Sequence, residues 1–125
     1  MKRERGAAVV DFVLIMVLLV PIVLGVLQVG LVMHVRNTLS AAASEGARSA
    51  AVVDADPADG AERARQLIRE AIADRYADDV SAGYASVDGV PGTIVRIRAS
   101  VPALGLFGPR VSITVEGHAI REVAP

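Results

Sequence analysis

The sequence predicts an α+β protein with a long N-terminal transmembrane helix that continues outward, a second amphipathic helix and a small antiparallel sheet of about three strands. Three observations support this prediction. Residues 12–33 carry no formal charge, apolar residues recur at helical spacing after residue 57, and from residue 82 the apolar period shortens toward two. The chain has 125 residues, so the part beyond the apolar run has room for one small domain.

The N-terminal apolar run is long enough to cross a membrane, because ~20 helical residues span a hydrocarbon core of ~30 Å. The N-terminal tail at residues 1–6 carries three basic residues and one acid, and basic residues favour the cytoplasmic side of a membrane. We therefore expect residues 1–6 in the cytoplasm and residues 36–125 outside it. A long signal peptide cleaved after Ala43 is the alternative, but a polar stretch separates that position from the apolar run.

Proline and glycine interrupt the apolar run. Pro21 cannot donate a hydrogen bond to the carbonyl of Val17, which predicts a kink or local unwinding. Gly25 and Gly30 have two interpretations. Glycines are common in membrane helices, and they also mark faces where another helix comes close.

The helix is expected to continue to about residue 53, because no proline interrupts residues 35–53 and alanine favours helix. Small residues recur there every four positions and form a smooth stripe that lets backbones approach closely. This stripe packs on the protein's own head, on neighbouring subunits, or on both, and the sequence leaves these possibilities open. Its residues are Ala42, Ala43, Gly46, Ala47, Ala50 and Ala51.

A second helix is predicted to begin at Pro57, with Asp56 as its N-cap or with Asp59 and Glu62 as an alternative cap pair. Its apolar positions have the spacing of a half-buried helix. They are Ala64, Leu67, Ile68, Ala71, Ile72, Tyr76 and Val80. The opposite face, with Glu62, Arg65, Arg69 and Asp74, is expected to face solvent.

Alternating residues predict antiparallel strands at 95–101 and 111–115, and a weaker strand at 82–87. Turn residues occur at 88–89 and 91–92. The loop at 102–109 carries three large apolar side chains, which cap the small core or contact a partner or the bilayer. They are Leu104, Leu106 and Phe107.

Composition argues against several functions. The chain has no cysteine, which excludes thiolate metal sites and cysteine nucleophiles. A formal net charge of −1 gives no electrostatic case for nucleic acid. His34 and His118 stand apart from acidic clusters and form neither a metal site nor a triad. We therefore expect no enzymatic activity, no cofactor, no metal, no nucleic-acid partner and no small-molecule substrate.

The junction between the basic stub and the apolar run carries the most informative motif. The stub ends at Gly6, small residues follow from Ala7, and one acid, Asp11, enters the apolar helix. A carboxylate at the edge of a hydrocarbon core must be solvated or paired. Either Asp11 lies at headgroup level near the positive helix end, or the chain is cut after Gly6 and Asp11 pairs with the new amine of a neighbouring subunit.

This arrangement is similar to a prepilin-type leader, in which an aspartyl peptidase in the membrane cuts after glycine. The fuller pattern resembles the TadE family of tight-adherence (Tad, Flp-type) pilus proteins, whose helix opens with an R-G-A-A-hydrophobic-E-F stretch and continues with a V-R-N … A-A-x-E-G-A-R-x-A-A stretch. The matching segments here are RGAAVVDF at residues 5–12, VRN at 35–37 and AASEGARSAA at 42–51. One departure is Asp11, where the family usually has glutamate.

The resemblance implies a pilin-like fold and a structural role as a minor pilin or pseudopilin. It implies cleavage between Gly6 and Ala7 by prepilin peptidase, and subunit pairing through Asp11. The expected partners are membrane lipid, prepilin peptidase, other pilins or pseudopilins, and the pilus assembly platform. The expected location is the bacterial cytoplasmic membrane, and the cell surface or pilus after assembly.

The predicted segments follow from this combination. They are a cytoplasmic leader at 1–6, a transmembrane helix at 7–35, an outward extension at 36–53 and an extracytoplasmic head at 54–125. The alternative function is that of an unprocessed single-pass membrane protein with an extracytoplasmic binding or scaffold domain.

Overall fold

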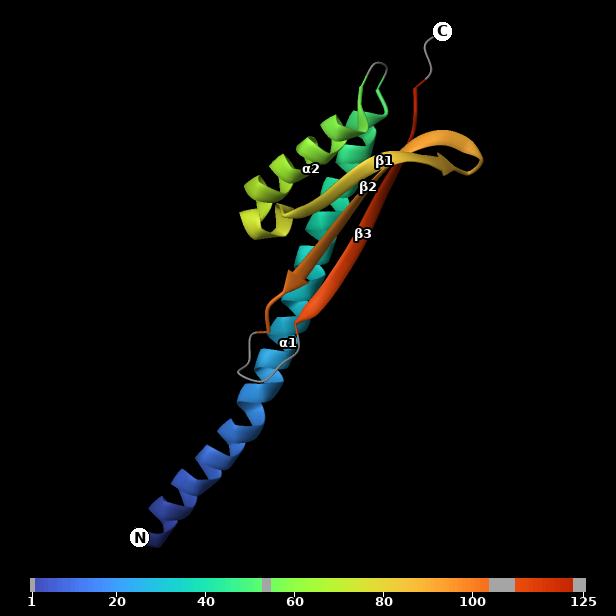
Figure 1. The fold of residues 1–125 in the computed structure, drawn as a ribbon. Helices are drawn as coiled ribbons and strands as arrows, with labels where there is room; N and C mark the ends of the chain where they lie inside the picture. The colour runs from blue at the N-terminus through green and yellow to red at the C-terminus, as the bar shows by residue number, and fades with distance from the viewer. Residues whose placement is uncertain (1, 53–54, 104–109, 123–125) are drawn as a thin grey trace.

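The structure is a computed structural model that describes residues 2–52, 55–103 and 110–122. A long helix α1 (Lys2–Ala50) runs into a small head built from a second helix and three strands (Figure 1). The head elements are α2 (Pro57–Ala71), the short 3₁₀ helix η1 (Asp74–Ala77), β1 (Asp79–Val87), β2 (Val90–Val101) and β3 (Val111–Ile120). The predicted α+β class, with one long helix, a second helix and three antiparallel strands, is confirmed.

Helix α1 differs from the predicted 7–53 helix at both ends. It begins at Lys2, so it includes most of the predicted leader, and it passes through Pro21 without a break in its assignment. It ends at Ala50, where the N–H of Ala51 donates to the carbonyl of Arg48 at 3.1 Å instead of one residue further back. Such a tightened last turn is a common helix ending.

Helix α2 begins where Pro57 predicts. Asp56 accepts from the N–H of Ala58, and the Asp59 side chain accepts from the N–H of Asp56, so these two acids form the capping box. The alternative cap pair of Asp59 with Glu62 is therefore wrong, because Asp59 occupies the third helical position.

The predicted extension of this helix toward Val80 is also wrong. The chain leaves the helix after Ala71, and Ala73 is extended at φ −157° and ψ 152°. Tyr76 then lies in η1 and Val80 in β1. Both side chains are nevertheless buried. The apolar spacing therefore predicted the buried residues correctly, although the helix ends before them.

The sheet has the order β1-β2-β3 with antiparallel neighbours. Asp88 and Gly89 form the β1–β2 turn with φ of 52° and 80°, the left-handed region that favours Gly and Asp. The second predicted turn is wrong, because Pro91 and Gly92 lie inside β2. Strand β1 also begins earlier than predicted, at Asp79.

Both helices cover the same face of the sheet. Helix α1 packs on β2 and β3, and α2 lies over β1 (Figure 1). Leu39, Ile68 and Ile97 are the largest fully buried side chains, one each from α1, α2 and β2. The other sheet face carries Arg96 paired with Glu116 at 2.7 Å. The three apolar residues predicted to cap the core, Leu104, Leu106 and Phe107, lie outside the described residues.

Candidate functional site: the two halves of the long helix

Helix α1 is divided into an uncovered half and a covered half. From residue 3 to residue 34 none of its described side chains is buried, and Val35 is the first that is. The uncovered half carries large apolar side chains in the open, among them Val17 at 66% and Leu18 at 69% exposure. Among the described residues, α1 is the one helix that is long and apolar enough to cross a membrane. Such an all-round apolar helix needs lipid or other helices around it.

The residues of the predicted cleavage and pairing motif lie in the first turns of α1. Gly6, Ala7 and Asp11 are all exposed, and Asp11 follows Ala7 by one helical turn on the same face. None of the ion pairs found among the described residues includes Asp11. The structure thus leaves all three residues accessible to other molecules.

The predicted packing glycines of the uncovered half have no close neighbour among the described residues. A Cβ atom added to Gly25 or Gly30 would have no described heavy atom within 4 Å. The described residues therefore provide no close packing partner for either glycine.

The small-residue stripe of the covered half packs on the protein's own head. Ala42, Ala43, Gly46, Ala47 and Ala50 are all buried. In the structure these residues pack on the head, which was one of the interpretations that the sequence left open.

Two close backbone approaches account for this packing. A Cβ on Gly46 would lie 2.6 Å from the carbonyl oxygen of Gly60 in α2. A Cβ on Gly117 in β3 would collide with the backbone of Ala43 and the nitrogen of Ser44. The small residues of α1 therefore serve to bring both α2 and β3 against its backbone.

The sheet also holds the carboxyl end of α1. Thr93 is fully buried, and its hydroxyl donates to the carbonyl of Ala47 at 2.8 Å. The N–H of Glu122 donates to the carbonyl of Ala51 at 2.8 Å. Carbonyls in the last turn of a helix lack partners within the helix, so these two contacts satisfy groups that would otherwise be left open.

Sequence reasoning missed Gly60, Gly117 and Thr93 as partners of the stripe. A signal was present for the glycines, since glycine inside a helix or a strand often marks close backbone approach. Nothing in the sequence paired either of them with a particular residue of α1.

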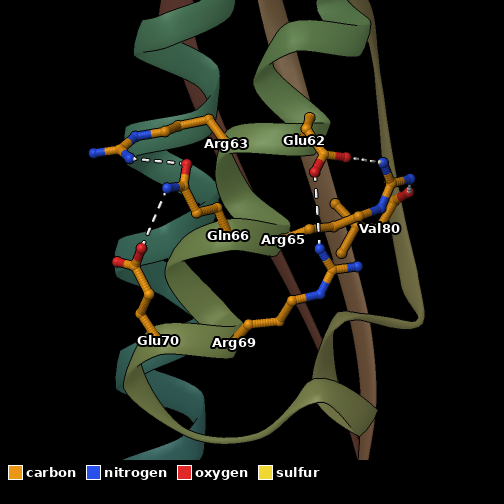
Figure 2. A network of polar contacts seen from close by, with 7 residues as sticks. All are labelled: Glu62, Arg63, Arg65, Gln66, Arg69, Glu70 and Val80. Atoms are coloured by element: carbon orange, nitrogen blue, oxygen red, sulfur yellow. Dashed lines mark hydrogen bonds and ion pairs between the residues drawn. The ribbon is translucent and has the colours of Figure 1, made fainter.

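The outward face of α2 is polar, as predicted, and Figure 2 shows its network of contacts. Glu62 pairs with Arg65 at 3.4 Å and with Arg69 at 3.8 Å. Arg65 also donates to the carbonyl of Val80 at 3.0 Å, which ties α2 to β1. Gln66 contacts Arg63 and Glu70 along the same face. Exposed pairs of this kind contribute little stability, ~0.2–1 kcal/mol each.

Further polar features of the described residues are an open groove between the helices and an exposed histidine. An open groove of about 720 Å³ between α1 and α2 is lined by Asn37, Glu45 and Arg48, among others. His118 lies 3.9 Å from Glu116 on the exposed sheet face. Among the described residues no group of three or more His, Cys, Asp or Glu side chains could hold a metal ion.

Comparison with known proteins gives one match. The family model described as TadE-like protein matches residues 6–48. No curated protein and no solved structure matches the chain significantly. The matched segment begins at Gly6, includes nearly all of the uncovered half of α1, and ends within the half that packs on the head. The resemblance to the TadE-like family is therefore confirmed over these residues, and the long apolar helix that contains them fits membrane anchoring.

Proposed function

We propose that this protein is a minor pilin or pseudopilin of a Tad-type pilus with a structural, non-enzymatic role. In this proposal α1 anchors the subunit in the bacterial cytoplasmic membrane, with residues 1–6 inside and the head outside. Prepilin peptidase cuts after Gly6, and the mature subunit then joins or primes the pilus together with other pilins and the assembly platform.

The observation that carries the proposal is the division of α1 near Val35. Fully burying one large apolar side chain is worth ~1.5–3 kcal/mol, and residues 9–33 expose many of them. A soluble protein would fold its head over such a surface. The described part of this chain leaves it uncovered, and both lipid and a bundle of sibling helices would cover it.

The position of the motif residues supports processing. Gly6 is exposed, and a Cβ there would meet nothing within 4 Å, so a membrane peptidase has access to the bond that follows. Cleavage would give Ala7 a free amine one helical turn before Asp11. In a bundle of staggered helices this carboxylate would pair with the amine of a neighbour, which would remove the cost of a lone charge in an apolar environment.

The head has a second part in the proposal. Its packing on residues 35–51 through Gly60 and Gly117 makes α1 and the head one unit. The assembling helix and the exposed head would therefore move out of the membrane together.

Complementation of a deletion strain tests the proposal. A strain without this chain should lose Tad pili or make fewer, and the parent chain should restore them. Gly6→Leu should fail to restore them, because a bulky residue blocks cleavage, whereas Val9→Leu, a nearby exposed position of α1, should restore them. Normal piliation in the deletion strain, or full rescue by Gly6→Leu, would contradict the proposal.

A further inference from the structure

The head contacts α1 at a point inside the uncharged run. The side-chain nitrogen Nε2 of Gln28 donates to the carbonyl oxygen of Pro102 at 3.2 Å. Pro102 follows directly after β2, and Ala103 comes next. We call Gln28, Pro102 and Ala103 the lower rim of the head. The run without charge continues past Gln28 to Met33, so the lower rim lies more than a helical turn inside it.

The helix between Asp11 and the lower rim is shorter than the hydrocarbon core is thick. From Asp11 to Gln28 the helix rises ~26 Å, at 1.5 Å per residue. The hydrocarbon core of a bilayer is ~30 Å thick. Asp11 and the lower rim therefore cannot both lie outside the hydrocarbon core, and any tilt of α1 shortens the available length further. From Asp11 to His34, by contrast, the helix rises ~35 Å, which is enough.

The chemistry of the two ends decides which one enters the bilayer. Asp11 carries a charge, and an unpaired carboxylate is costly in hydrocarbon. At the lower rim, Pro102 has no N–H group, its carbonyl is satisfied by Gln28, and Ala103 has an apolar side chain. Backbone groups with partners inside the protein are the ones that lipid tolerates.

The exposed side of α1 points the same way. Val29 and Met33 are 63% and 52% exposed, so an apolar surface continues beyond the level of Gln28. The next residues along the chain, His34 and Arg36, are polar and exposed. This change of character places the outer membrane boundary near Met33.

We propose that the lower rim of the head lies just inside the outer edge of the hydrocarbon core, beneath the headgroups, where Pro102 and Ala103 contact lipid. The inference rests on the proposed anchoring of α1 with the head outside. Gln28 is then a positioning residue that satisfies the Pro102 carbonyl at this depth. The β1–β2 turn at Asp88 and Gly89 lies at the opposite end of the sheet (Figure 1), and in this proposal it would lie away from the membrane.

Depth-dependent fluorescence quenching tests the proposal. The chain has no cysteine, so single-cysteine variants of the full chain take one environment-sensitive probe each. The labelled protein is reconstituted in phosphatidylcholine–phosphatidylglycerol vesicles that contain a lipid quencher either at the headgroup or deep in the acyl chains. Probes at Ala103→Cys and Met33→Cys report the lower rim and the proposed boundary.

Three further positions make the result interpretable. Arg110 lies at the same end of the sheet as the lower rim, beside Val111, which pairs with Val101. The variant Arg110→Cys replaces Ala103→Cys if the latter disturbs folding. Ser86→Cys is an exposed position near the β1–β2 turn, far from the lower rim. Val17→Cys lies in the middle of the uncovered half and reports the span itself.

The expected result is strong quenching at Ala103 or Arg110 by the headgroup quencher, comparable to that at Met33, with Ser86 unaffected and Val17 responding to the deep quencher. If Val17 responds to the deep quencher while Ala103 and Arg110 stay as unaffected as Ser86, the lower rim is not in the bilayer and the inference is overturned. If Val17 does not respond either, the anchoring in the proposed function has failed.

Discussion

Gly46 and Gly60 bring the backbones of α1 and α2 into direct contact. A Cβ atom on Gly46 would lie 2.6 Å from the carbonyl oxygen of Gly60, and one on Gly60 would lie 2.5 Å from the carbonyl oxygen of Gly46. Because each glycine lacks a Cβ atom, it leaves room for the backbone of the other helix. Because these are backbone atoms in two helices, no side-chain rotation can make room, and this pair determines how α2 sits on α1.

The first prediction concerns this helix crossing. Gly46→Ala should destabilise the head, because the overpacking cost of ~1–3 kcal/mol exceeds the gain of ~1 kcal/mol in helix propensity. Gly30→Ala is the matched control on the same helix, since a Cβ there meets nothing within 4 Å. Thermal unfolding of both variants in detergent, followed by circular dichroism, measures the difference. An unfolding midpoint for Gly46→Ala equal to that for Gly30→Ala would contradict the close contact.

The second prediction concerns the contact between α1 and β3. Gly117→Ala should lower the stability of the head by ~1–3 kcal/mol, because the new Cβ would collide with the backbone of Ala43. Gly83→Ala in β1 is the control, because a Cβ there meets nothing within 4 Å. Urea unfolding midpoints of the two variants make the comparison, and equal midpoints would show that β3 does not lie against α1 as described.

The third prediction concerns the hydroxyl of Thr93. Thr93→Val keeps the side-chain shape but leaves the Ala47 carbonyl without its donor, since the N–H of Ala51 bonds to Arg48 instead. The expected loss is ~1–3 kcal/mol, the usual cost of an unsatisfied buried group. Thr114→Val, an exposed position on β3, should change stability by less than ~0.5 kcal/mol. Chemical denaturation gives both values, and an unchanged stability for Thr93→Val would rule out this role.

The elements of the fold could be predicted from the sequence where one physical signal dominates. Uncharged length revealed the N-terminal helix, the Asp-Pro pair marked the start of α2, and alternation revealed β2 and β3. The end of α2 could not be predicted in this way, because Tyr76 and Val80 continue the helical spacing although the chain has already turned. An apolar pattern shows which residues are buried but not the path of the backbone. A continued helix and the observed helix, 3₁₀ turn and strand place apolar residues at the same sequence positions.

Contacts between elements were less predictable than the elements. The alanine and glycine stripe of α1 indicated a close approach, but it fits the protein's own head and a neighbouring helix equally well. Only the placement of Gly60 and Gly117 opposite Gly46 and Ala43 shows that the head takes this surface. The motif at Gly6 and Asp11 could be proposed from the sequence because it is defined by chain position and charge, and its role stays a prediction.

The fourth prediction concerns the charge of Asp11. Asp11→Ala should leave membrane insertion unchanged, because an apolar residue in this run favours the bilayer, but should reduce incorporation into pili by removing the partner of the neighbouring amine. Asp11→Glu keeps the charge and should assemble. Immunoblots of membrane and sheared-pilus fractions provide the measurement, and assembly of Asp11→Ala at the parent level would show that the pairing is not needed.

The most direct test of the central claim is the intact mass of the protein from cells with and without prepilin peptidase. The proposal predicts that the subunit from membranes and pili of normal cells begins at Ala7, and that the subunit from cells without the peptidase retains the leader up to and including Gly6. A subunit in assembled pili that still carries Met1, or an identical mass in both strains, would contradict it.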